Sequence, residues 1–69
     1  MTYQAQLDLT FDTAGFLSAR ALEMCGTEDE DPEALEEAAY IFYGLRMWSA
    51  SERCREKVRR FRQAQERTP

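Results

Sequence analysis

The first residues of the chain alternate between apolar and polar side chains. Apolar residues occupy every second position from Tyr3 to Phe11, and polar residues stand between them. A period of two is typical of a β-strand with one buried face. We therefore predict a strand or extended arm over residues 3–11, with a helix as the alternative. A lone strand cannot satisfy its own backbone hydrogen bonds. We expect it to pair with a second copy or another protein's sheet edge, or to lie over its own helices.

After residue 12 the apolar residues recur at helical spacing, which predicts a helix over residues 13–25. Asp12 or Thr13 is suited to cap its start, and Gly26 is suited to end it. The apolar positions of this segment are Phe16, Leu17, Ala21, Leu22, Met24 and Cys25. Residues 27–33 contain five acidic residues and no core position, so we expect an exposed acidic loop.

A second helix is predicted over residues 32–48, with Asp31 as its N-cap and Pro32 in its first turn. One face of this helix would carry Leu35, Ala38, Ala39, Phe42 and Leu45. The apolar surface is extended by Tyr40, Ile41, Tyr43, Met47 and Trp48. A helix this apolar either lies at the centre of the fold or exposes a binding patch.

A third helix is predicted over residues 50–66, because Ser49 and Glu52 have the spacing of a capping box. Its apolar stripe is thin and consists of Cys54, Val58 and Phe61, extended by Ala50 and Ala64. The second and third helices could also form one long, bent helix. The predicted fold class is mainly α: a small three-helix domain, spanning residues 1–69, with an N-terminal strand or arm.

Composition argues against catalysis and against a cofactor. The chain has no histidine, and its three glycines are scattered rather than grouped in a phosphate-binding loop. Cys25 and Cys54 are expected to be reduced and buried, and they are too few for a zinc site. The arginines around Cys54 would lower the pKa of its thiol, but no base is available to activate it. We therefore expect no enzyme, no metal and no cofactor.

No signal segment precedes the first helix, and no apolar run is long enough to cross a membrane. These features predict a soluble, cytoplasmic protein.

Charge divides the chain into two parts. Residues 1–48 hold ten acidic and two basic residues, a net charge of −8, whereas residues 49–69 hold seven basic and three acidic residues, a net charge of +4. The two parts could neutralise each other within one molecule. The acidic part could instead face a basic partner. The basic helix could also contact nucleic acid, although the acidic overall balance opposes phosphate binding.

The leading hypothesis is a small, non-enzymatic inhibitor or adaptor that occupies a basic site on a nucleic-acid-handling protein. Aromatic residues are enriched at protein interfaces, so Tyr40 and Tyr43 extend the predicted surface. The predicted partner-binding residues are Glu28, Asp29, Glu30, Asp31, Glu33, Glu36, Glu37, Tyr40 and Tyr43. Direct binding to nucleic acid or membrane is not expected, and a homodimer is possible through strand pairing.

Two resemblances extend this picture. The order strand, helix, helix over residues 3–48, with Gly26 between the helices, resembles the ribbon-helix-helix family. That resemblance implies that Gln4, Gln6 and Asp8 would read the major groove, and it gives the alternative function of a homodimeric DNA-binding regulator. As a small, acidic, helical chain without catalytic motifs, the protein also resembles phage-encoded inhibitors of the anti-CRISPR type. That profile implies a protein partner.

Overall fold

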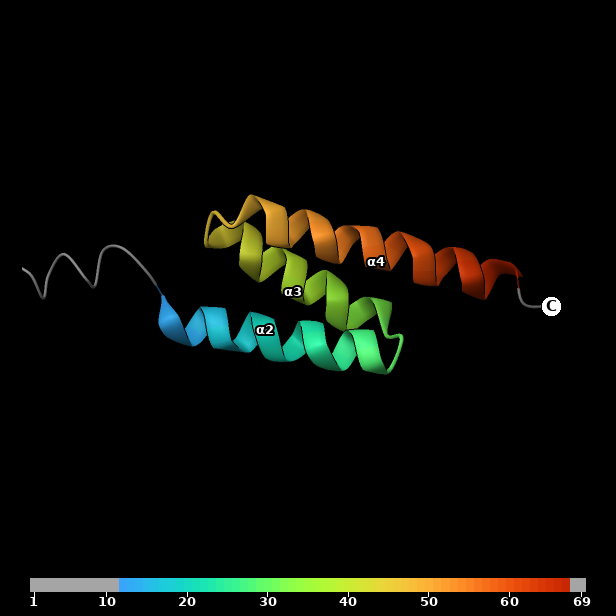
Figure 1. The fold of residues 1–69 in the computed structure, drawn as a ribbon, viewed down its shortest axis with the longest axis horizontal. Coiled ribbons are helices and arrows are strands. Elements are labelled where there is room, and N and C mark those ends of the chain that lie inside the picture. The colour runs from blue at the N-terminus through green and yellow to red at the C-terminus, as the bar shows by residue number, and fades with distance from the viewer. Residues whose placement is uncertain (1–11, 68–69) are drawn as a thin grey trace, which may run out of the picture.

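The computed structural model describes residues 12–67, which form three α-helices (Figure 1). These are α2 (Thr13–Glu28), α3 (Pro32–Gly44) and α4 (Trp48–Arg67). Helices make up 88% of the described residues, so the predicted mainly α class is confirmed. The strand or arm predicted over residues 3–11 lies outside the described residues.

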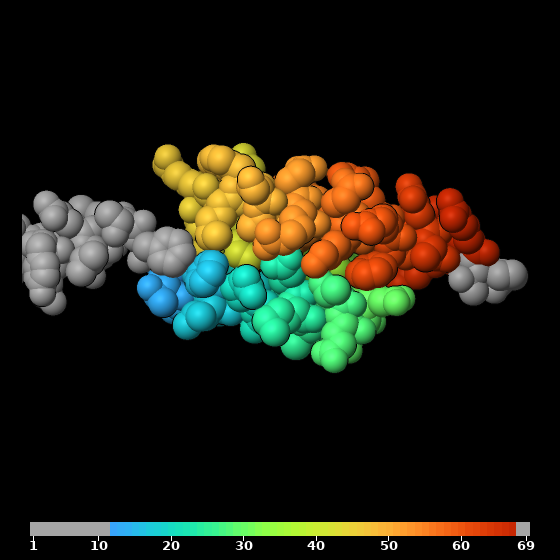
Figure 2. Space-filling model, in the orientation of Figure 1, coloured from blue at the N-terminus to red at the C-terminus, as the bar shows by residue number. Residues whose placement is uncertain are grey.

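Helix α3 occupies the middle of the fold, and α2 and α4 pack along it from two sides (Figure 1). The short turns between the helices make consecutive helices antiparallel. Helix α4 has 20 residues against 13 in α3, so its C-terminal turns extend beyond the start of α3. In the space-filling view, α2 and α4 meet and hide most of α3 (Figure 2).

The core is small and combines a few large side chains with several alanines. The largest fully buried side chains are those of Leu35, Phe42 and Cys54. The other buried hydrophobic residues are Ala19, Ala38, Ala39, Ala50 and Val58. The core face predicted for α3 is confirmed except at its end, where Leu45 is only half-buried. Phe16 and Phe42 meet edge to face, with ring centroids 6.5 Å apart, and so join α2 to α3.

The buried face of α2 differs from the one predicted. Its buried residues are Ala19, Glu23 and Gly26, whereas Leu17 and Met24 are about three-fifths exposed. The cause is close helix packing: a Cβ added at Gly26 would lie 2.8 Å from Cγ of Leu35. Small residues therefore decide which side of α2 faces α3. Of the predicted stripe, Phe16 and Leu22 pack against the core, whereas Leu17, Ala21, Met24 and Cys25 are exposed.

The sequence suggested that Gly26 ends α2. The helix instead continues to Glu28. The chain reverses at Glu30, whose φ of 52° is left-handed, and the N–H of Asp31 donates to the carbonyl of Gly26 over 2.8 Å. This bond closes a Schellman motif, in which glycine usually occupies the left-handed position. The predicted loop over residues 27–33 is therefore shorter, because its first two and last two residues are helical.

The predicted N-caps of α2 and α3 are confirmed. The Asp12 carboxylate accepts a hydrogen bond from the N–H of Gly15 over 2.9 Å, which settles the choice of cap for α2. The Asp31 carboxylate accepts from the N–H of Glu33 over 3.1 Å, and Pro32 is the first residue of α3. Both caps satisfy backbone donors that would otherwise have no partner within the helix.

Helix α3 ends at Gly44, four residues before the predicted end at residue 48. Arg46 has a left-handed φ of 64°, and the N–H of Met47 donates to the carbonyl of Phe42 over 2.9 Å. This is a second Schellman motif without glycine at its left-handed position. The turn separates α3 from α4, so the alternative of one long, bent helix is wrong.

Helix α4 begins at Trp48, so Ser49 lies inside the helix. The prediction that Ser49 caps this helix is therefore wrong. Its neighbour Ser51 is buried and donates from Oγ to the carbonyl of Ala39 over 2.9 Å. That hydrogen bond fixes the start of α4 against the middle of α3.

Candidate functional site

Helix α3 leaves one face uncovered by its two neighbours. Its exposed residues are Glu33, Glu36, Glu37, Tyr40, Tyr43 and Gly44. At about 3.6 residues per turn, these positions fall on one side of the helix. We call Glu33, Glu36, Glu37, Tyr40 and Tyr43 the α3 face. The structure thus brings these five predicted partner-binding residues together on one surface.

The other predicted site residues lie in the turn that leads into α3. Glu28, Asp29, Glu30 and Asp31 are all exposed. They stand at the end of the molecule where the C-terminal half of α4 passes (Figure 1). The carboxylate of Asp31 is occupied as the cap of α3. The acidic turn therefore continues the α3 face at its N-terminal end.

Some acidic residues are neutralised by α4. Glu36 pairs with Arg62 at 3.1 Å, and Glu23 pairs with Arg53 and Lys57. The prediction that the two parts of the chain attract each other therefore holds at these sites. Within residues 12–67, however, no basic group lies within ion-pair distance of Glu28, Asp29, Glu30, Glu33 or Glu37. These five carboxylate residues are all exposed.

The aromatic part of the α3 face is open to solvent. Tyr40 is 78% exposed and Tyr43 is 53% exposed. Tyr43 meets Trp48 edge to face, with ring centroids 5.0 Å apart, and the Arg55 guanidinium lies 5.7 Å from the Tyr43 ring centroid. The apolar surface predicted around α3 is thus divided: Phe42 builds the core, and the two tyrosines and Trp48 form a surface patch.

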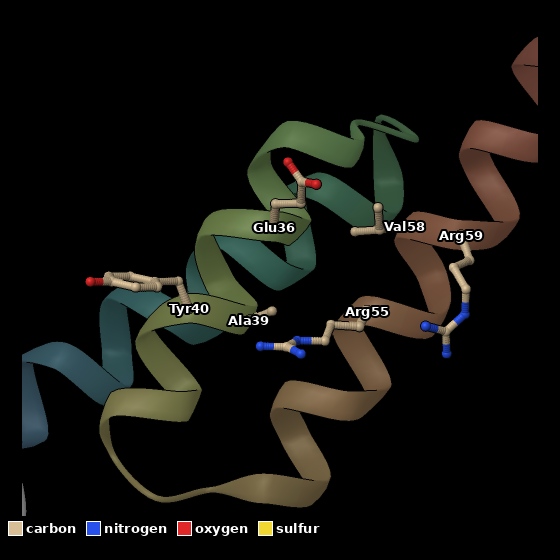
Figure 3. Close-up of a pocket in the computed structure, with 6 residues that line it drawn as sticks. All are labelled: Glu36, Ala39, Tyr40, Arg55, Val58 and Arg59. Carbon is tan, nitrogen blue, oxygen red and sulfur yellow. The ribbon is translucent and has the colours of Figure 1, made fainter.

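Tyr40 separates two grooves. The first, of about 410 Å³, lies between α3 and α4 and is lined by Glu36, Ala39, Tyr40, Arg55, Val58 and Arg59 (Figure 3). In it Arg55 reaches from α4 toward α3, and Tyr40 points outward (Figure 3). The second, of about 490 Å³, lies at the C-terminal end of α3 and is lined by Asp12, Tyr40, Ile41, Tyr43, Gly44 and Leu45. Hydrophobic periodicity gave no signal for either groove, because the first combines residues of α3 and α4 and the second adds Asp12, from the start of α2, to residues of α3 and its C-cap.

A buried ion pair connects α2 to α4 behind this surface. The side chain of Glu23 is 8% exposed and accepts two hydrogen bonds from Arg53, at 2.5 and 2.8 Å. Lys57 donates to the same carboxylate over 3.3 Å and to the hydroxyl of Thr27 over 3.0 Å. The hydrogen bonds from Arg53 lower the pKa of Glu23 below its ordinary value, although burial opposes them. Glu23 therefore stays ionised and holds the two outer helices together.

The cysteines are both free, as predicted, but only Cys54 is buried, and Cys25 is exposed. Burial, together with the nearby Glu23 carboxylate, raises the pKa of the Cys54 thiol. The sequence had suggested a lowered pKa from neighbouring arginines. That prediction is wrong because Arg53 directs its charge to Glu23, and the thiol faces the core. Cys54 is therefore a packing residue in this structure.

The described residues lack two further features. They include no group of three or more cysteine, aspartate or glutamate side chains placed to hold a metal ion. In the same residues, none of the helices combines the length and apolar character that crossing a membrane requires.

No protein-family model, curated protein or solved structure matches this chain. The ribbon-helix-helix resemblance placed Gly26 between two helices, but α2 runs through that residue. The positions that it assigned to base reading, Gln4, Gln6 and Asp8, lie outside the described residues.

Proposed function

We propose that this protein is a small inhibitor or adaptor whose α3 face, together with the acidic turn, occupies a basic site on a nucleic-acid-handling protein. One observation carries the proposal. Glu33 and Glu37, with no basic partner among residues 12–67, share an exposed helix face with Tyr40. The surface thus offers free carboxylates and an open aromatic ring side by side.

This combination suits arginine and lysine side chains. Carboxylates accept paired hydrogen bonds from guanidinium groups, and a tyrosine ring attracts a cation over its face. Carboxylates of one sign also steer a basic partner and repel acidic ones. Proteins that bind nucleic acid carry basic residues where they meet phosphate. An inhibitor of the anti-CRISPR type would be one instance of this function.

Affinity capture with a tagged chain of residues 1–69, followed by mass spectrometry, tests the proposal. We expect the wild-type chain to retain basic nucleic-acid-binding proteins, and added salt to weaken the retention. The Glu33→Gln/Glu37→Gln variant should weaken it about tenfold, because each 1.4 kcal/mol of lost charge pairing changes affinity by that factor. The control is Glu66→Gln, which removes a charge from exposed α4 away from the α3 face.

A second variant probes the acidic turn and reverses the charge at Glu28, Asp29 and Glu30. Asp31 is left unchanged because it caps α3, so the fold is preserved. Unchanged retention by both the face and the turn variants would refute the proposal. A gel-shift titration with genomic fragments addresses the alternative function, since sequence-specific retardation would favour a DNA-binding regulator.

A further inference from the structure

The groove at the C-terminal end of α3 is mainly apolar. Ile41 and Leu45 are half-buried in its lining, and Tyr40 and Tyr43 stand exposed beside them. Gly44 also lines the groove, and the space beside it is open, because a Cβ added there would meet no atom within 4 Å. The charged lining residue is Asp12, whose carboxylate caps α2. The groove thus has the character of a pocket for an apolar side chain.

The groove lies in line with the free carboxylates. Glu33, Glu37, Tyr40 and Gly44 are spaced i, i+4, i+7 and i+11, so they follow one line along α3. At about 1.5 Å per residue, this line extends roughly 17 Å from Glu33 to Gly44. Its N-terminal end is acidic and its C-terminal end is apolar.

We infer that this line is the docking track for a basic amphipathic helix of the partner. One large apolar side chain of that helix enters the groove beside Gly44. Its lysines or arginines, about two to three turns away, lie over Glu33 and Glu37. The inference rests on the proposed function and specifies its partner. A helix laid in a groove with anchors at helical spacing is a common mode of peptide recognition.

Charge selects a basic occupant over an acidic one. On the α4 side of the track, Arg62 is paired with Glu36, and Arg55 lies over the Tyr43 ring. Along the track itself, Glu33 and Glu37 lack a basic partner within residues 12–67. An acidic helix would meet like charge there, whereas a basic one gains complementary pairs.

A synthetic peptide tests this geometry. The probe is a capped, alanine-based helical peptide of about 14 residues, with two leucines in its first turn and three arginines in its last turns. The control peptides replace the leucines with alanine, or the arginines with glutamate. The Gly44 amide signal of the ¹⁵N-labelled full chain reports on the groove, and Trp48 fluorescence reports on its Tyr43 side.

We expect a saturable shift of the Gly44 signal with the leucine and arginine peptide. Replacing the leucines should weaken binding about tenfold or more, since each buried leucine contributes on the order of that factor. Gly44→Gln should weaken it similarly, because the added side chain fills open space without a clash. Ser49→Gln adds the same side chain outside the groove and should leave binding unchanged.

Equal binding by the alanine control peptide, or by Gly44→Gln, would overturn the inference. If such binding still required the peptide arginines and Glu33 and Glu37, the proposed function would stand without it. A Gly44 shift that depends on protein concentration would assign the groove to a second copy. A shift caused by Leu7→Asp without peptide would assign it to the chain's own N-terminal residues, and either result refutes the partner-helix inference.

Discussion

Replacing Glu23 with glutamine should lower the free energy of unfolding by about 1–2 kcal/mol at neutral pH. Glutamine keeps the shape of the side chain, so the loss reports the charge rather than the packing. The carboxylate is almost fully buried and receives three hydrogen bonds, two from Arg53 and one from Lys57. Hydrogen bonds to charged groups contribute more than neutral ones.

The size of the loss follows from the exposure of the partners. Breaking a fully buried pair typically costs about 3–5 kcal/mol, because an uncompensated charge stays buried. Here the side chains of Arg53 and Lys57 are 46% and 24% exposed, so water can solvate both cations once Glu23 is neutral. An exposed ion pair contributes about 0–1 kcal/mol. The loss expected for Glu23→Gln therefore lies between the exposed and the fully buried case.

Urea unfolding followed by circular dichroism measures this difference. A double-mutant cycle with Arg53→Met isolates the pair, and methionine preserves contact with the Phe42 ring, 5.9 Å from the guanidinium. The matched control is Arg59→Gln, which removes an exposed pairing with Glu52 and Glu56 on the same helix. We expect the control to be indistinguishable from wild type. A coupling energy near zero, or a Glu23→Gln variant as stable as the control, would refute the assignment.

The same pair predicts a pH dependence. The pKa of Glu23 is lower in the folded protein than its ordinary value of 4.5. The stabilisation is therefore complete above the unfolded pKa and is lost as the pH falls through the lower folded pKa. The stability difference between wild type and Glu23→Gln should shrink on acidification and stay constant near neutral pH. A difference that grows with acidification would contradict this sign.

Three further predictions concern the backbone, and all are measured by thermal and urea unfolding. Gly26→Ala should destabilise the protein by about 1–3 kcal/mol, because its Cβ would meet Leu35 Cγ at 2.8 Å. Gly44→Ala, where the space is open, should instead stabilise it by up to about 1 kcal/mol; equal effects at the two glycines would contradict the packing argument. Arg46→Gly should raise the melting temperature by a few degrees. The left-handed conformation of Arg46 costs about 1 kcal/mol, and glycine adopts it without this cost. A lower melting temperature for this variant would mean that the Arg46 side chain outweighs the backbone strain.

Much of the fold follows from local patterns in the sequence. The caps at Asp12 and Asp31 are determined by residues within three positions of the helix start, and they are found where predicted. The core face of α3 follows from its helical spacing, because that helix has neighbours on two sides. The composition of the site, with acidic residues followed by tyrosines, is also visible in the sequence.

The tertiary structure decided which residues face one another. Glu23 is buried because Arg53, thirty residues later in the chain, reaches it from α4. A local pattern cannot contain that information, and the helical periodicity of the sequence gave no prediction for this glutamate. The helix ends differ for a related reason. Glu30 and Arg46 adopt left-handed conformations that glycine would favour, and the antiparallel packing of the helices holds them there.

The candidate site divides in the same way. The order of residues in α3 is enough to group its carboxylates and tyrosines, because residues three and four apart share a helix face. The packing of the three helices leaves these residues uncovered and partly unpaired, and it opens a groove beside Gly44. Exposure and pairing depend on where α2 and α4 pack. That packing is set by contacts between residues far apart in the chain.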